Sequence, residues 1–174
     1  MPDGPTGGPP QFLLSTVVEA PAVRVMQAFF SHTDLTYWWR VERSVTVARA
    51  SGPFAVTWPA TDDRDDLLGQ LGGTLHGTVM DCMANRAVFV ADVYWQPPQG
   101  DPLGPMALEI TFEPVDGSER TKVSVRQSAS DDGPRWQRYF ALTKVGWSDA
   151  LATLKDYLEN EWLYRVKSLK QAKP

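Results

Sequence analysis

An amphipathic segment near the C-terminus places the strongest constraint on the fold, because it predicts one long helix from Pro134 to Tyr164. Its mostly apolar residues recur every three or four positions and so form one continuous stripe along a helix. The stripe contains Trp136, Phe140, Thr143, Trp147, Leu151, Leu154, Leu158 and Trp162. Several aromatic side chains on one face must be buried, and only the upstream strands offer enough surface. The sequence therefore predicts a sheet packed against this helix, with a hollow between them where a ligand could bind.

The chain before this helix alternates apolar and polar residues with the period of two that is typical of β-strands. The clearest alternating segments are residues 54–58, 106–113 and 122–126. Each of these strands should therefore bury one face. Residues 87–91 are apolar throughout, which favours a central strand covered on both faces. These patterns predict an antiparallel meander that ends beside the C-terminal helix.

Two short helices should follow the first strand. A β-favouring run at 12–19 leads into Ala20-Pro21, where proline suits the first turn of a helix. A second helical turn is predicted to end at Trp38-Trp39. The fold class predicted from this order is α+β.

Length and composition favour a single globular domain. The chain has 174 residues, of which 43% are apolar, enough for a substantial core. Residues 1–11 are rich in proline and glycine, so we expect a disordered N-terminal tail. The domain is expected to span 12–165, and residues 166–174 to form a C-terminal tail.

Charge and cysteine content narrow the partners and the compartment. A formal net charge of −4 gives no basic surface for phosphates, so we expect no nucleic-acid partner and no membrane partner. The N-terminus lacks the pattern of a signal peptide, and no apolar run approaches the roughly 18 residues that span a bilayer. Cys82 is the only cysteine and cannot form an internal disulfide. We expect a cytoplasmic protein, either a monomer or a homodimer.

No motif for hydrolysis, zinc-dependent proteolysis or nucleotide binding occurs in the sequence. The run DDRDD at 62–66 lacks the glycine and closing glutamate of a calcium loop, so we interpret it as a solvated acidic loop. We therefore expect no metal, no cofactor and no identifiable catalytic residue.

The orientation of His76 depends on strand register. If Leu75 and Val79 face the helix, His76 faces solvent; if Thr78 and Met80 face it, His76 enters the hollow. An inward imidazole could hydrogen-bond a ligand or transfer protons near neutral pH. Both registers remain open at this point.

Two further residues raise similar questions. Arg43 shares parity with Val41 and Val45, so unbroken alternation would direct it inward, whereas a bulge or a strand that starts there would leave it outside. Gly146 lies within the predicted helix, where glycine costs about 1 kcal/mol relative to alanine. We expect a neighbouring backbone or ring to require the small residue there.

Several short motifs follow one another along the chain: Ala20-Pro21, Trp38-Trp39, Gly52-Pro53-Phe54, His76-Gly77-Thr78-Val79, and Gly146-Trp147 with Leu151 and Leu154. In this order they resemble the homologues of the activator of heat-shock-protein ATPase, within the START-like or SRPBCC superfamily. The resemblance covers about residues 12–162. The chain departs from the usual pattern at the acidic insert with GQLGG and at the proline-rich segment Gln96 to Pro105.

The resemblance implies a helix-grip fold: a curved antiparallel sheet of about seven strands around a long C-terminal helix, with two short helices after the first strand. It also implies an apolar cavity that holds lipids, polyketides or similar molecules. Some superfamily members are cyclases or aromatases, and the eukaryotic relatives are co-chaperones in the stress response. Fold alone does not choose among these functions.

We interpret the chain as a binding protein for a small apolar ligand, possibly aromatic, polyketide-like or lipid-like, held between sheet and helix. The candidate ligand-binding residues are Trp39, Arg43, Phe54, Trp58, His76, Trp95, Trp136, Phe140 and Thr143. One alternative is a polyketide cyclase or aromatase with His76 as the acid-base group. The other is a co-chaperone-like module that contacts a chaperone through an exposed apolar patch.

Overall fold

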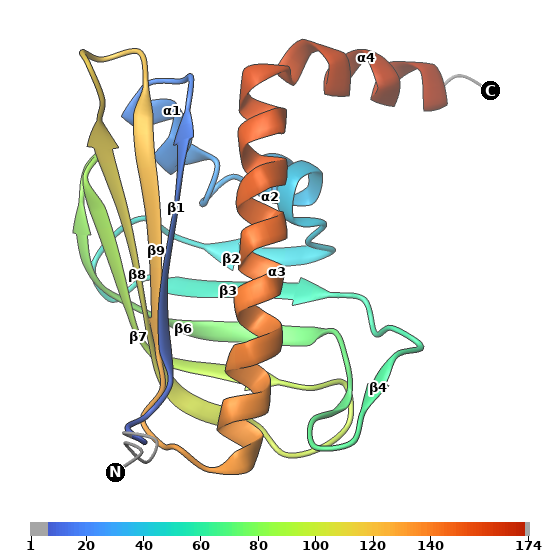
Figure 1. Cartoon of the computed structure of the whole chain (residues 1–174). Helices are drawn as coiled ribbons and strands as arrows, with labels where there is room; N and C mark the ends of the chain where they lie inside the picture. The colour runs from blue at the N-terminus through green and yellow to red at the C-terminus, as the bar shows by residue number, and fades with distance from the viewer. Residues whose placement is uncertain (1–6, 173–174) are drawn as a thin grey trace, which may run out of the picture.

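The computed structural model describes residues 7–172, which form a curved antiparallel sheet gripping one long helix (Figure 1). The elements are β1 (Gln11–Val18), α1 (Ala22–Gln27), α2 (His32–Trp39), β2 (Arg43–Thr46), β3 (Pro53–Trp58), β4 (Arg64–Asp65), β5 (Gly69–Gln70), β6 (Gly73–Met83), β7 (Ala87–Gln96), β8 (Leu103–Pro114), β9 (Thr121–Ser128), α3 (Pro134–Glu159) and α4 (Glu161–Gln171). Most of the expected N-terminal tail, residues 1–6, and the end of the expected C-terminal tail, residues 173–174, lie outside the described residues.

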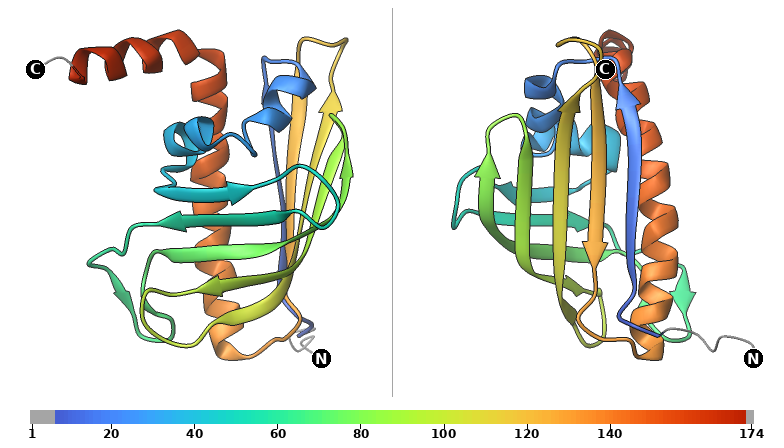
Figure 2. Two further views of the ribbon diagram at one scale, coloured as in Figure 1. Left: turned by 180° about the vertical axis from the view of Figure 1, so that it is seen from behind. Right: turned by 60° about the vertical axis from the view of Figure 1, so that its left-hand side comes forward.

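The main sheet has seven strands in the order β1-β9-β8-β7-β6-β3-β2, with every neighbouring pair antiparallel. Strands β1 and β2 are consecutive in the chain but lie at opposite edges, so α1 and α2 bridge the width of the sheet (Figure 2). The remaining strands, β4 and β5, form a small separate hairpin between β3 and β6. The predicted helix-grip fold is confirmed.

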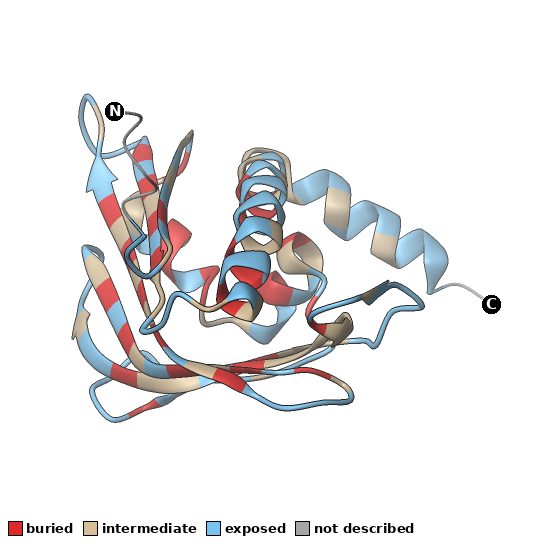
Figure 3. Cartoon of the chain, turned by 60° about the horizontal axis from the view of Figure 1, so that its bottom comes forward, coloured by how far each residue is buried: buried red, intermediate tan, exposed pale blue. Residues whose placement is uncertain are grey.

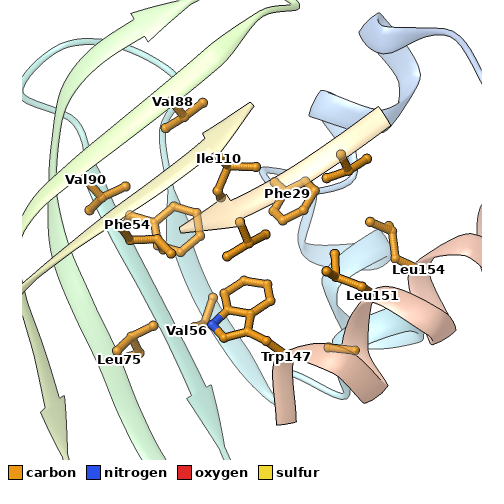
Figure 4. Packing of buried hydrophobic residues seen from close by; sticks show 14 of the residues in the cluster. Phe29, Phe54, Val56, Leu75, Val88, Val90, Ile110, Trp147, Leu151 and Leu154 are labelled. Atoms are coloured by element: carbon orange, nitrogen blue, oxygen red, sulfur yellow. The ribbon is translucent and has the colours of Figure 1, made fainter. Parts of the chain in front are cut away.

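Helix α3 packs across the concave face with the stripe that the sequence predicted. Six members of the stripe, Trp136, Phe140, Trp147, Leu151, Leu154 and Leu158, are buried against the sheet and α2. Figure 3 shows buried positions alternating with exposed ones along the strands, and buried positions along α3. In Figure 4, Trp147 projects from α3 toward Val56 and Leu75 of the sheet.

The predicted single helix to Tyr164 is wrong at its C-terminal end. Helix α3 stops at Glu159, and Asn160 leaves the helical conformation with φ −135° and ψ 34°. The Asn160 side-chain amide donates to the Asp156 carbonyl, a local bond that competes with further helix. The chain then turns into α4, which extends away from the sheet (Figure 1). Trp162 therefore leaves the stripe and is 66% exposed.

Strand β7 is central in the sheet, as its apolar sequence predicted, but it is covered on one face only. Val88 and Val90 are fully buried, whereas Phe89 between them is 38% exposed. All the helices pack on or beside the concave side, so the outer face of the sheet is left to solvent (Figure 2). Among residues 7–172, no helix is both long enough and apolar enough to cross a bilayer.

A buried ion pair ties the helices together at one end of the molecule. The Arg24 guanidinium of α1 donates two hydrogen bonds, each 2.8 Å, to the Asp34 carboxylate of α2. Tyr157 of α3 donates to the same carboxylate at 2.5 Å, and Arg24 also donates to Glu161 of α4 at 2.9 Å. Four helices therefore share one hydrogen-bonded network.

The network sets the ionisation of its members. Burial opposes ionisation of Asp34, but the hydrogen bonds from Arg24 and Tyr157 outweigh it, so the pKa of this carboxyl lies below its ordinary value. Burial and the hydrogen bond to Asp34 both raise the pKa of Tyr157. At neutral pH Asp34 is therefore ionised and Tyr157 keeps its donor proton.

Candidate functional site

A cavity of about 880 Å³ lies between α3 and the concave face of the sheet. Its volume falls within the range of roughly 300–1,000 Å³ that holds drug-sized ligands. Arg40, Asp63, Gly146 and Asp149 border it and are exposed, so they mark the mouth of the cavity. The site is therefore a solvent-accessible hollow of the kind that the sheet-and-helix arrangement predicts.

Three tryptophans from three elements form one wall. Trp39 ends α2, Trp58 ends β3, and Trp147 lies in the middle of α3. The ring of Trp39 lies 5.0 Å from that of Trp58 and 4.5 Å from that of Trp147, measured between centroids. The Trp58 indole N–H donates to the Trp39 carbonyl at 2.9 Å. Because this polar group is satisfied inside the wall, the Trp58 ring can make apolar contacts in the cavity without an unpaired N–H.

A second aromatic pair borders the cavity. The ring centroids of Trp95 in β7 and Tyr139 in α3 lie 5.2 Å apart. The Trp95 indole N–H donates to the Gly72 carbonyl at 2.8 Å, which fixes the ring against the segment that follows the β4–β5 hairpin. The cavity is thus enclosed by aromatic groups from both the sheet and the helix.

A polar cluster, defined as Gln127, Tyr139 and Thr143, interrupts this apolar lining. Gln127 of β9 is fully buried, and its side-chain oxygen accepts the Trp147 indole N–H at 2.9 Å. Its amide nitrogen lies 3.4 Å from the Met106 sulfur, a weak acceptor. Burial raises the pKa of Tyr139 to about 12, although hydrogen bonds with Thr143 and Gln127 partly oppose this shift. Tyr139 is therefore a protonated hydrogen-bond donor at neutral pH.

Two arginines of α3, one turn apart, hold the loops beside the mouth. Arg138 donates to the Asp65 carboxylate at 2.6 Å, and Asp65 also accepts the backbone N–H of Leu68 at 3.2 Å. The bond from Arg138 lowers the pKa of Asp65. Arg135 donates to the backbone carbonyls of Asp101 and Pro102. The acidic insert and the proline-rich segment are therefore both attached to the start of the helix.

The acidic insert is more ordered than the predicted solvated loop. Asp65 belongs to the β4–β5 hairpin, and Leu68 after it is only 3% exposed and lines the cavity. Asp62, Asp63 and Asp66 are exposed, as expected. Within the part of the chain that the structure describes, no group of three His, Cys, Asp or Glu side chains could hold a metal ion.

Four of the nine predicted ligand-binding residues border the cavity: Trp39, Trp58, Trp95 and Thr143. Phe54, Trp136 and Phe140 are instead core residues, between 1% and 8% exposed, and none of them borders the cavity. Phe140 packs on Phe12 of β1, with ring centroids 5.8 Å apart. The stripe marks the buried side of α3, but it cannot tell a residue covered by strands from one that faces open space.

His76 and Arg43 lie outside the cavity. Leu75 and Val79 face α3, so His76 points to the outer face of the sheet and stacks on Tyr94 at 5.9 Å. Arg43 is exposed at the start of edge strand β2, where Val45 of the same parity is also 60% exposed. The placement of both residues in the ligand site was wrong, because the side of the strand that each occupies faces solvent.

Gln127 and Tyr139 were missed, although the sequence carries a signal for each. Gln127 continues the inward parity of Val123 and Val125, so it is a polar residue at a core position of its strand. Tyr139 precedes Thr143 by four residues on the same helix face. A buried amide next to a helical hydroxyl pair is a stronger sign of a polar contact site than an isolated histidine.

The steric reason expected for Gly146 is absent. A methyl group added at this glycine would meet no atom within 4 Å, and the residue is exposed at the mouth of the cavity. The small residue therefore leaves space beside the opening and is not required by a packed neighbour.

Comparison with known families identifies the fold family. Residues 19–159, most of the chain, match the family described as Activator of Hsp90 ATPase homolog 1-like protein. The chain belongs to this family. Its aromatic cavity and gripping sheet are therefore those of a member of the Activator of Hsp90 ATPase homolog 1-like family. No curated protein matches the sequence.

Solved structures support the same fold at low sequence identity. Protein MLL2253 from Mesorhizobium loti is 16% identical, with a TM-score of 0.63 over 86% of this chain and 97% of that one. The Aha1 dimer from Colwellia psychrerythraea is 17% identical, with a TM-score of 0.61 over 87% and 97%. A Rhodobacter sphaeroides protein is 15% identical, with a TM-score of 0.68 over 90% and 96%. These likenesses establish the fold of the family and not a ligand.

Proposed function

We propose that this protein binds a small, largely apolar ligand with one or more aromatic or fused rings in the cavity between α3 and the sheet. The observation that carries the proposal is the cavity of about 880 Å³ lined by four tryptophans, three of which, Trp58, Trp95 and Trp147, donate their indole N–H to protein acceptors. A lining made mostly of flat apolar rings, with few polar groups, favours ring-containing molecules of lipid or polyketide type over sugars or nucleotides.

Fluorescence titration with the neutral dye Nile red tests the proposal. We expect saturable enhancement of dye emission and quenching of tryptophan emission as the cavity fills. Val145→Trp, which adds a large ring to an exposed valine that borders the cavity, should weaken binding at least tenfold. Val23→Trp, at a similarly exposed valine on α1 that does not border the cavity, is the control. Equal binding by both variants and the parent would contradict the proposal.

A cyclase-type reaction in the same cavity has less support. His76, the acid-base group on which that alternative depended, stacks on Tyr94 at the outer face. Tyr139, which does face the cavity, has its pKa raised by burial to about 12, so it donates a hydrogen bond but is a poor proton acceptor near pH 7. Binding without proton transfer is therefore the function that the geometry favours.

A specific observation favours a second candidate function, self-association through α4. No residue of this helix is buried, and Trp162, Val166 and Leu169 form one exposed apolar face. Arg165 and Lys170 flank that face, while the chain as a whole carries a net charge of −4. A basic, apolar helix on an otherwise acidic molecule suits the surface of a second copy. The related Colwellia protein is described as a dimer.

Sedimentation velocity over a range of protein concentrations tests this second candidate. We expect reversible formation of a dimer, and Trp162→Glu should shift the protein to the monomer. Leu13→Glu, at a leucine that is 54% exposed on edge strand β1, is the matched control and should leave the dimer intact. A parent protein that remains monomeric at its solubility limit would rule out association through α4.

A further inference from the structure

The polar cluster lies on facing elements and offers hydrogen-bond donors to the cavity. Tyr139 and Thr143 are one turn apart on α3, and Gln127 faces them from β9. The Trp147 indole can only donate, so the Gln127 oxygen must face it and the amide NH₂ group must point elsewhere. Besides its contact with the Tyr139 hydroxyl, that NH₂ group donates only to the sulfur of Met106, at 3.4 Å. A better acceptor inside the cavity could replace this weak bond.

Charged side chains that border the cavity are confined to its mouth. Arg40, Asp63 and Asp149 border the cavity, and all three are exposed. The deeper lining contains no lysine, arginine, aspartate or glutamate among residues 7–172. A charged ligand group placed at the polar cluster would therefore lose its hydration without an opposite charge beside it.

From these two observations we infer that the ligand is electrically neutral and carries a carbonyl or hydroxyl oxygen that binds at the polar cluster, as in a fused-ring ketone, quinone or phenol. The Tyr139 hydroxyl, the Thr143 hydroxyl and the Gln127 amide are the donors for that oxygen. The inference excludes free fatty acids and other carboxylates with their charged end inside. It rests on the proposed binding function, which it makes chemically specific.

Three probes of nearly identical shape test the inference. They are 2-acetylnaphthalene, which carries a neutral acceptor, 2-isopropenylnaphthalene, which carries none, and 2-naphthoate, which is an anion at pH 7. Equilibrium dialysis against the full-length protein gives the dissociation constant of each. We expect the ketone to bind about fivefold to tenfold more tightly than the alkene, the increment of one net hydrogen bond. The carboxylate should bind at least tenfold more weakly than the ketone.

The double variant Tyr139→Phe/Thr143→Val removes two hydroxyl donors with little change of shape. It should reduce the preference for ketone over alkene at least twofold, with the Gln127 amide as the remaining donor, while leaving the affinity for the alkene unchanged. Tyr94→Phe, which removes a hydroxyl from the outer face beside His76, should retain the full preference. Thr143→Val alone should give an intermediate preference and replaces the double variant if that protein does not fold by circular dichroism.

The outcomes separate this inference from the proposed function. If the alkene and ketone bind equally well to the parent, or if the carboxylate binds best, the inference is overturned while cavity binding stands. An unchanged ketone preference in a folded donor variant overturns it as well. If none of the three probes and no Nile red binds, the proposed function fails and the inference fails with it.

Discussion

An Arg24→Met variant should lose about 3–5 kcal/mol of unfolding free energy, the usual cost of removing one partner from a buried ion pair. Asp34 is 5% exposed, and its carboxylate would keep its charge with only the hydroxyls of Tyr157 and Ser31 as hydrogen-bond donors. Methionine occupies most of the volume of the arginine aliphatic chain. The lost unfolding free energy therefore reports on the charge and its hydrogen bonds. Urea denaturation followed by far-UV circular dichroism measures the change.

A double variant provides the matched control. Arg24→Met/Asp34→Asn removes both charges and leaves an amide that can still accept the Tyr157 hydroxyl. It should be more stable than Arg24→Met alone, because no unpaired charge is then buried. If the loss of unfolding free energy in the double variant equals the sum of the losses in Arg24→Met and Asp34→Asn, the two residues do not interact and the network has been misassigned.

The same pair predicts a pH dependence with a definite sign. The native pKa of Asp34 lies below the unfolded value of about 3.9, so the unfolded chain binds more protons in this range and the stabilisation is lost as the pH falls through the native pKa. In Arg24→Met, burial without the guanidinium should instead raise the pKa of Asp34 above the unfolded value. The stability gap between parent and variant should therefore widen from pH 4 to pH 7.

A Trp147→Ala variant should be destabilised by about 3–5 kcal/mol, the range for truncating a buried tryptophan. Trp147 is 3% exposed, packs against Trp39 and donates its indole N–H to Gln127. The substitution removes the ring, enlarges the cavity and leaves the buried Gln127 oxygen without its donor. Thermal and urea unfolding monitored by circular dichroism quantify the loss, and Trp147→Phe provides a milder variant if the alanine protein does not fold.

The matched control is the same substitution at Trp162, which follows in the predicted stripe but is 66% exposed on α4. In dilute solution, where the chain is monomeric, Trp162→Ala should change the unfolding free energy by no more than about 0.5 kcal/mol, as surface substitutions commonly do. Similar losses at both tryptophans under these conditions would contradict the exposed position of Trp162 on α4. Dye binding should fall in Trp147→Ala and remain unchanged in Trp162→Ala.

Much of the fold was accessible from the sequence because its periodicities are strong. The three- and four-residue spacing of Trp147, Leu151 and Leu154 determined the buried side of α3, and alternation identified the strands. The sequence did not predict where α3 ends. The apolar pattern continues past Asn160, whereas the backbone leaves the helical conformation at that residue. Phe89 was misassigned because an apolar run does not reveal how many faces of a sheet are covered.

The candidate site was harder to predict, since burial and cavity lining produce the same apolar signal. Trp39, Trp58 and Trp95 border open space, whereas Phe54 and Phe140 are equally apolar and lie in the packed core. The distinction depends on which strand crosses above each residue, which is a property of the tertiary arrangement. Polar residues at inward positions, such as Gln127, carry more information because burying an amide requires partners.

The glycine in the middle of α3 has a consequence for how this molecule could be engineered. Alanine at Gly146 would fit without a clash and would favour the helix by about 1 kcal/mol. The added methyl group would also project beside the opening, and each larger side chain would obstruct it further. Substitutions at Gly146 that raise thermal stability are therefore expected to slow the entry and release of a ligand.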